Sequence, residues 1–147
     1  MARKMIILVM RFSDKFAPAE GTIAVHKAII EEKGAVWYGK FGASPSEKVL
    51  KSLMSEKNPM ILLIKNGGKE KYWAKIEAYT KTSPTQDVPD YYQNLGDRFG
   101  VWFKITDIFQ AEDNVASRCI VASSMRPLSE VLHSMSPFFI ADYEKSK

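Results

Sequence analysis

Cysteine and histidine are scarce in this sequence. Among its 147 residues there is one cysteine, Cys119, and there are two histidines, His26 and His133. A lone thiol excludes a disulfide within the chain and indicates a reducing compartment. Because the two histidines fall in separate predicted helices, with no close group of other ligand residues, we expect no tetrahedral zinc site. Cys119 lies in an apolar run and is interpreted as a small buried residue.

Long apolar runs are also missing. The run Met5–Met10 ends at Arg11 and is much shorter than the roughly 20 residues of a membrane span. The basic residues before it give a faint likeness to a signal peptide, but a buried first strand explains the run better. We therefore expect a soluble, cytoplasmic protein.

The common signatures of catalysis and nucleotide binding do not occur. No GxGxxG, P-loop or GxSxG pattern is present, so we expect no cofactor and no catalytic residue. Distant carboxylates such as Asp14, Glu77 and Asp107 could still converge in the fold. A small enzyme or small-molecule binder therefore stays open as an alternative.

The composition is that of a folded domain with a mild basic excess. The chain is 46% hydrophobic and carries a formal net charge of +4, which suits one domain with its own core. The charge is compatible with a polyanionic partner but does not require one. We expect a single domain over residues 1–141 and a polar tail, 142–147, that frays or begins a linker.

The hydrophobic periodicity predicts alternating strands and helices. One helix runs from Thr22 to a stop at Gly34, and the capping box Ser44–Glu47, with Pro45 at the first helical position, begins a second that buries Leu50. Strands are predicted at Met5–Met10, Met60–Ile64, Lys69–Tyr79, Val101–Ile105 and Ser117–Ala122, with a hairpin turn at Asn66–Gly68 and a short last helix after Pro127. This order indicates an α+β fold: a curved mixed sheet or small β-barrel flanked by helices.

Aromatic residues gather in three places. The stretch Ala35–Gly42 joins three aromatics and a lysine to two glycines, which suits either stacking of a planar base or an ordinary core strand. In the strand after the hairpin, Trp73 shares a face with Lys71 and Lys75, where it can stack on a base or cover a second apolar patch. The polar loop 81–97 is long for a compact domain, and such loops are often functional.

The order of these motifs resembles the YTH domain and the related EVE domains of the PUA-like superfamily. The likeness covers roughly Thr22 to Leu132. It includes Val36-Trp37 after the first helix, the strand Gly100–Ile105 after the long loop, and Arg126 with Glu130 near the end. In that family an aromatic cage holds a methylated base that has left the strand, and some prokaryotic relatives are specificity modules of modification-dependent restriction systems.

The resemblance implies a set of site residues. Trp37 matches the first cage wall, Tyr91 or Tyr92 stands where the family has a Trp, and Phe99 matches the apolar third wall. Tyr38 and Trp73 are candidates for further stacking. Candidates for phosphate contacts are Lys40, Lys71, Lys75, Lys104 and Arg126, although for each lysine alone a solvated surface position is the safer interpretation. The Asp that follows the family's Arg is Pro127 here, and Tyr38-Gly39-Lys40 lacks the usual hydroxyl residues, so the identity of the base is left open.

The function that this resemblance implies is binding without bond making. A methylated base, N6-methyladenine or 5-methylcytosine, would be flipped into the cage, with DNA in a prokaryotic restriction or defence system favoured over RNA. A nuclease or motor in cis or in trans would supply the effect on the target. The alternatives are an RNA-binding PUA-like module that ignores modification, and a small-molecule binder or enzyme that uses the same pocket.

Overall fold

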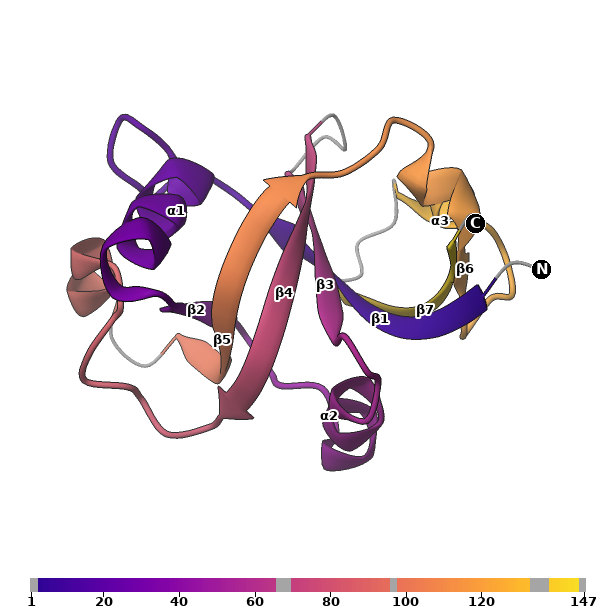
Figure 1. Ribbon diagram of the computed structural model, residues 1–147, viewed down its shortest axis with the longest axis horizontal. Coiled ribbons are helices and arrows are strands. Elements are labelled where there is room, and N and C mark those ends of the chain that lie inside the picture. Colours follow the sequence, from indigo (N-terminus) through magenta and orange to yellow (C-terminus); the bar gives the residue numbers. More distant parts are fainter. Residues whose placement is uncertain (1–2, 66–69, 96–97, 133–137, 146–147) are drawn as a thin grey trace.

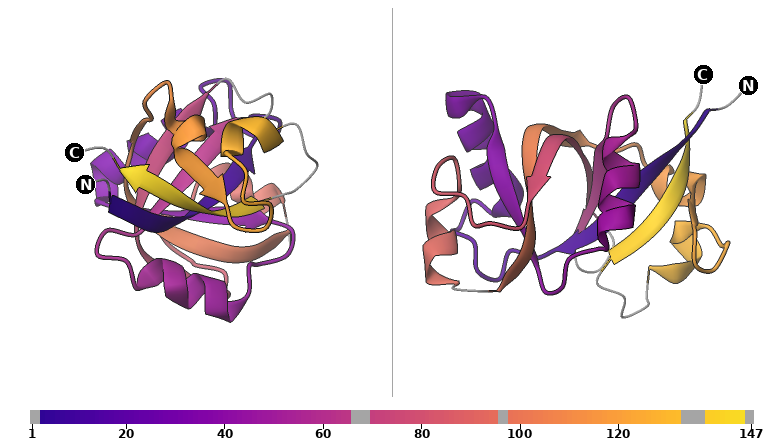
Figure 2. Two further views of the ribbon diagram at one scale, coloured as in Figure 1. Left: turned by 90° about the vertical axis from the view of Figure 1, so that its right-hand side faces the viewer. Right: turned by 90° about the horizontal axis from the view of Figure 1, so that it is seen from below.

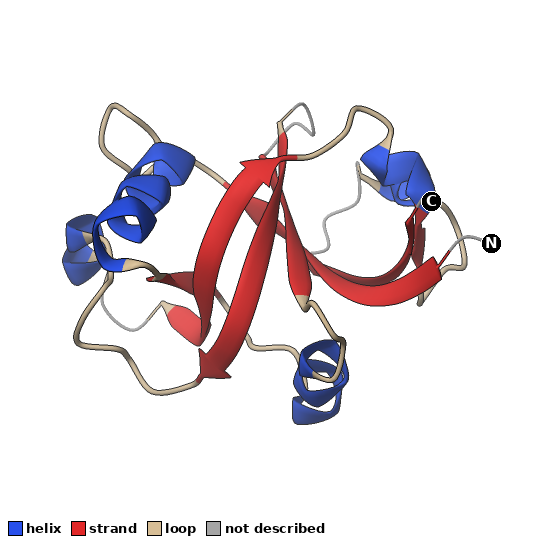
Figure 3. Ribbon diagram, viewed as in Figure 1, coloured by secondary structure: helices blue, strands red, loops and turns tan. Residues whose placement is uncertain are grey.

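The computed structural model describes residues 3–65, 70–95, 98–132 and 138–145, which form one seven-stranded sheet and three short α-helices (Figures 1 and 3). The strands are β1 (Arg3–Phe12), β2 (Val36–Phe41), β3 (Met60–Lys65), β4 (Lys71–Thr80), β5 (Phe99–Gln110), β6 (Cys119–Val121) and β7 (Phe138–Lys145). The helices are α1 (Thr22–Lys33), α2 (Glu47–Met54) and α3 (Leu128–Val131), with two 3₁₀ turns, η1 (Asp90–Asn94) and η2 (Val115–Arg118).

The sheet is mixed, open and strongly curved. Its strand order is β2-β5-β4-β3-β1-β7-β6, in which β1 and β3 pair in parallel and the other neighbours are antiparallel. The edge strands β2 and β6 lie near opposite ends of the molecule (Figures 1 and 2). The predicted α+β fold with a curved mixed sheet is therefore confirmed, and the sheet does not close into a barrel.

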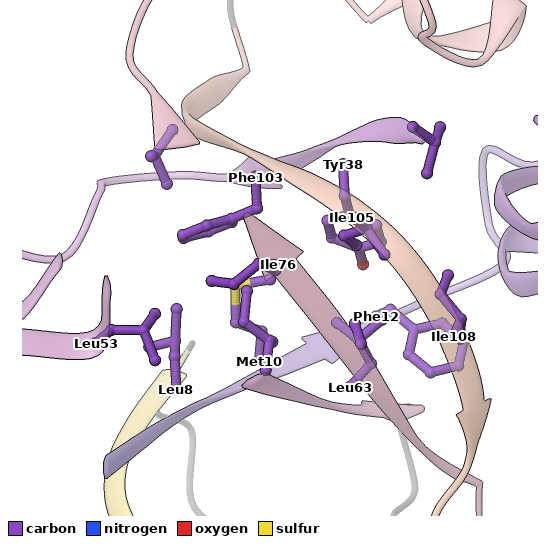
Figure 4. Close-up of a cluster of buried hydrophobic side chains, with 14 of the residues drawn as sticks. Leu8, Met10, Phe12, Tyr38, Leu53, Leu63, Ile76, Phe103, Ile105 and Ile108 are labelled. Atoms are coloured by element: carbon purple, nitrogen blue, oxygen red, sulfur yellow. The ribbon is translucent and has the colours of Figure 1, made fainter. Parts of the chain in front are cut away.

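The main core lies on one face of the sheet and is covered by α1 and α2. Alternate residues of the strands point into it, because side chains along a strand alternate between faces. Leu50 and Leu53 of α2 are fully buried there, as the helix pattern predicted. Figure 4 shows the centre of this core, which includes Leu8, Met10, Phe12, Tyr38, Leu53, Leu63, Ile76, Phe103, Ile105 and Ile108.

A second core covers the other face and is closed by η2 and α3. Ile7 and Val9 of β1 point into it, opposite in direction to Leu8 and Met10. Trp73 is 5% exposed and belongs to this core, so of the two roles left open for it the structure shows the cover of a second apolar patch. Cys119 is buried there as well, and burial raises the pKa of its thiol to about 12.

Four local predictions need correction or lie outside the described residues. The polar tail expected from Asp142 is part of β7 as far as Lys145, where it pairs with the first residues of β1. The cap of α2 is Ser46 rather than Ser44, since the Ser46 hydroxyl accepts a hydrogen bond from the Val49 amide at 3.3 Å. The turn at 66–68 and His133 lie outside the described residues.

Candidate functional site

The side chain of Trp37 lies on the outer face of the edge strand β2. Its neighbours Val36 and Tyr38 point into the main core, so alternation turns Trp37 the other way. Trp37 is only partly buried, and it is paired directly with Lys104 of β5. Tyr38 is 6% exposed and belongs to the main core, so it has no open face on which a base could stack.

The loop between β4 and β5 folds over this outer face and creates a third, aromatic cluster. Tyr92 and Trp102 are buried at its centre, with a ring-centroid distance of 5.6 Å, and Trp37 packs against their cluster. The ring of Phe99 lies over Gly39, where any Cβ would come within 2.4 Å of it. Only glycine at this position of β2 admits the Phe99 ring.

A buried hydrogen-bond chain holds the loop to α1 and β2. His26 Nδ1 is 2.8 Å from the carbonyl oxygen of Thr22, which can only accept, so Nδ1 donates. His26 Nε2 then accepts from the Tyr92 hydroxyl at 3.0 Å, and the Tyr92 oxygen accepts from the Gly39 amide at 3.4 Å. Burial lowers the pKa of His26 to about 4, so the imidazole is neutral near pH 7. These hydrogen bonds fix the position of Tyr92, against whose cluster Trp37 packs.

A shallow cavity of about 400 Å³, wide open to solvent, lies between Trp37 and the first part of the loop. Besides Trp37, its walls are Thr80, Thr82, Ser83, Pro84, Thr85, Gln86 and Asp87. The loop is tied to β2 by a 2.8 Å hydrogen bond from the Trp37 amide to the Asp87 carbonyl. Asp87 has a φ of 60°, a conformation that costs energy in a non-glycine residue and often marks functional loops.

These walls suit a flat, polar ligand. The indole offers an aromatic face, while hydroxyl, amide and carboxylate groups offer donors and acceptors to the edge of a heterocycle. Cavities that bind small ligands commonly measure about 300–1,000 Å³ and combine an apolar wall with a few polar groups. The cavity at Trp37 therefore has the size and lining of a site for a nucleobase-like ring.

The predicted aromatic cage is only partly assembled. The structure brings Trp37, Tyr91, Tyr92 and Phe99 into one cluster, but of these four only Trp37 lines the cavity. Tyr92 is 7% exposed and its hydroxyl is hydrogen-bonded to His26, so it is a buried residue of the cluster against which Trp37 packs. Tyr91 packs edge-on against Tyr92 and lines a separate acidic hollow beside α1.

The predicted cations are dispersed over the molecule. Lys104, across from Trp37, is close to the cavity and pairs with Glu77 at 3.0 Å. Lys40 is 5% exposed, and its ammonium donates to the carbonyls of Phe41 and Ala43. Burial lowers the Lys40 pKa, and these two carbonyls take two of the three N–H donors of the ammonium. Lys40 is thus better explained as a structural residue than as a phosphate contact.

Trp73 and Lys75 line a different and larger cavity, of about 910 Å³. The Trp73 indole N–H donates to Glu112 at 3.0 Å, and Glu112 also contacts Arg118 and the Tyr143 hydroxyl. The charged residues of its wall are Glu56, Glu112, Asp113, Lys57 and Lys75, so negative charges outnumber positive ones. That balance does not favour a polyanion.

Lys71 and Arg126 also lie away from Trp37. Lys71 is the first residue of β4, and it pairs with Ile64 of the neighbouring strand β3. Arg126 follows β6, which is at the other edge of the sheet from β2 (Figure 1). Its Nε lies 3.8 Å from Glu130. The structure therefore groups Lys104 with Trp37 and separates it from Lys71, Lys75 and Arg126.

The described residues contain neither a metal site nor a membrane-spanning helix. No group of three or more His, Cys, Asp or Glu within them could hold a metal ion. None of their helices is long and apolar enough to cross a membrane. The three acidic residues that could have converged are separate: Asp14 pairs with Lys65, Glu77 pairs with Lys104, and Asp107 lies on β5.

Comparison with known families gives a match over most of the chain. The profile of the Pua-like family matches residues 8–136. The chain belongs to the Pua-like family. Neither the curated proteins nor the solved structures contain a significant match. Membership of the Pua-like family indicates nucleic-acid or modified-base binding in general, and its domains are generally binding modules rather than enzymes.

Proposed function

We propose that this Pua-like chain is a reader that flips a methylated base out of a nucleic acid and holds it against Trp37. The observation that carries the proposal is the cavity of about 400 Å³ between Trp37 and the hydroxyl-rich loop Thr80–Asp87. The indole stacks on the base and the loop contacts its edge. N6-methyladenine is the favoured ligand and 5-methylcytosine the next, on DNA of a prokaryotic restriction or defence system, with a nuclease or motor as effector.

The energies are of the right size for such a reader. Flipping a base costs a few kcal/mol, and aromatic stacking returns about 1–3 kcal/mol per base. Burying one methyl group adds about 0.8 kcal/mol, equivalent to roughly a fourfold preference. Any larger preference has to come from the hydrogen bonds that the loop makes with the edge of the base.

The test is binding to matched DNA and RNA oligonucleotides at one salt concentration, followed by fluorescence anisotropy. The strands carry N6-methyladenine, 5-methylcytosine, N4-methylcytosine or no modification. We expect a preference of at least about fourfold for one methylated strand. Trp37→Leu keeps an apolar contact with the aromatic cluster but removes the stacking face, so it should abolish the preference. Phe109→Leu, in the larger cavity, is the matched control and should bind like the parent protein.

Equal affinity of the parent protein for methylated and plain RNA would instead support a module that ignores modification. A thermal shift with free nucleosides, without binding to any strand, would support a small-molecule site. An unchanged methyl preference in folded Trp37→Leu would contradict the assignment of the cavity.

A further inference from the structure

A second aromatic surface, with cations on its rim, lies at the far end of β2 from Trp37. It consists of Phe41, Phe99, Phe16, Lys15 and Arg98. Phe16 and Phe41 are 41% and 44% exposed, and they are two of the four large apolar side chains exposed in the described part of the chain. Exposing two neighbouring aromatic rings to water is unfavourable unless a partner covers them.

Phe41 is held as a platform. Its ring stacks on Phe99 with a centroid distance of 4.9 Å and an interplanar angle of 26°. The backbone beneath is fixed, because the Gly42 amide donates to the Arg98 carbonyl at 2.9 Å and a Cβ on Gly100 would come within 2.1 Å of the Gly42 oxygen. The exposed part of the Phe41 ring is thus presented rigidly to solvent.

Two cations lie beside the neighbouring ring of Phe16. The Lys15 ammonium and the Arg98 guanidinium each lie 5.3 Å from the centre of the Phe16 ring, which itself lies 5.9 Å from Phe41. Neither cation forms an ion pair with any described residue. The nearby carboxylate of Asp14 is paired with Lys65 at 3.0 Å, so it does not cancel their charge.

Resting on the proposed reader function, we infer that Phe41, Lys15 and Arg98 form a binding site for single-stranded nucleic acid flanking the flipped base. An exposed aromatic ring with two cations beside its aromatic neighbour matches a base with its phosphates, and in a duplex the faces of the bases are hidden from such a ring. Phe41 lies four residues beyond Trp37, about 13 Å at the rise of a strand. At the roughly 3.4 Å spacing of a stacked strand, at most about four nucleotides bridge the two sites.

Phe41→Leu and Arg98→Gln test this inference, with Phe109→Leu as the control at a similarly exposed ring, 38% exposed, elsewhere on the molecule. Phe41→Leu keeps an apolar contact with Phe99. It should weaken binding about tenfold to methylated and plain single strands alike, leaving the methyl preference unchanged. Arg98→Gln should lower the slope of log affinity against log salt by about one. Thermal unfolding checks that each variant is folded.

An abasic scan locates the contact. Single abasic sites are placed one to five nucleotides on each side of the methylated base. At one position the abasic site should weaken binding by the parent protein. At that position it should not weaken binding by Phe41→Leu, which has already lost the contact. The inference is overturned if folded Phe41→Leu binds single strands like the parent, or if it loses as much affinity for duplex as for single strands.

The two proposals fail in different ways. Loss of affinity in Phe41→Leu without any methyl preference in the parent protein would support this site and contradict the reader function. The opposite result is a methyl preference that is lost in Trp37→Leu but kept in Phe41→Leu, with the affinity of Phe41→Leu unchanged. It would support the reader function and contradict the site at Phe41. Absence of binding to every strand would contradict both.

Discussion

Trp37 and Trp73 each lie on a strand near lysines and each line a cavity, yet their surroundings differ. Trp73 is 5% exposed, and its indole N–H is taken by Glu112, which Tyr143 and Arg118 also contact. Trp37 is partly open and faces a loop of hydroxyl and amide groups. The same residue type thus completes a core in one region and offers a free face in the other.

The position of each strand in the sheet explains this difference. Trp73 is on β4, which has neighbours on both sides, and the segment from η2 to β6 covers its face. Trp37 is on the edge strand β2, where the β4–β5 loop covers part of the outer face. A tryptophan near lysines is therefore a binding candidate only when the elements around it leave part of the ring uncovered.

The largest effect that distinguishes the two regions should be on stability. Trp73→Ala should lower the free energy of unfolding by about 3–5 kcal/mol, because a large buried ring is lost and the Glu112 carboxylate loses a donor. Trp37→Ala should cost roughly 1 kcal/mol, near the average for a substitution. Urea denaturation measures both values. Similar losses in the two variants would mean that Trp37 is also a core residue.

Acid should loosen the Trp37 region before the Trp73 region. The folded-state pKa of His26 is lowered to about 4 by burial, below its unfolded value near 6.5, so the unfolded chain binds the extra proton. Stability should therefore fall as the pH drops from about 6.5 to about 4, by on the order of 3 kcal/mol, and then level off.

The contacts of Glu112 in the Trp73 region should weaken only at a lower pH. Burial acts to raise the pKa of Glu112, but hydrogen bonds from Tyr143 and Trp73 outweigh it and hold the pKa below the usual value. Its stabilising effect is thus complete above the normal pKa of a carboxyl group and is lost as the pH falls from that value through the lowered pKa. Urea titrations between pH 7 and 4 measure the slope, which His26→Gln should flatten. A flat profile in the parent protein between pH 6.5 and 4.5 would contradict this account.

The smallest effect concerns the lysines of the two regions. Lys104→Gln should weaken binding to every strand a few-fold and lower the salt slope by about one, because this cation lies beside Trp37. Lys75→Gln, in the larger cavity where acidic residues outnumber basic ones, should leave both quantities unchanged. Anisotropy titrations over a range of salt concentrations measure the two slopes. Equal losses in both variants would argue for a diffuse basic surface instead of a defined path.

Local patterns predicted much of the fold. The continuous apolar run of β1 and the apolar stripe of α2 are visible within short windows, and so is the alternation of β4 that separates Trp73 from Ala74. The strand β7 was missed, although its buried residues Phe139, Ala141 and Tyr143 alternate with Ile140, Asp142 and Glu144. Its partner β1 lies at the other end of the chain, and charges at its end resemble those of a frayed terminus.

The candidate site was predictable only where its residues lie close together in the sequence. Trp37 was found because glycines and other aromatics surround it in sequence. The other walls belong to a loop without periodicity, so only its length and its hydroxyl residues could have indicated them. The buried role of Tyr92 depends on His26, which is 66 residues away, and no short window contains both.

The central claim, that a base enters the cavity at Trp37, is tested most directly by 2-aminopurine fluorescence. The probe is placed next to the methylated base in a strand that the parent protein binds. When that base flips out, its neighbour loses a stacking partner and its fluorescence rises. We expect a rise with the parent protein and with Phe109→Leu, and none with Trp37→Leu at saturating concentration. Binding by the parent protein without a rise, or an equal rise with Trp37→Leu, would contradict the claim.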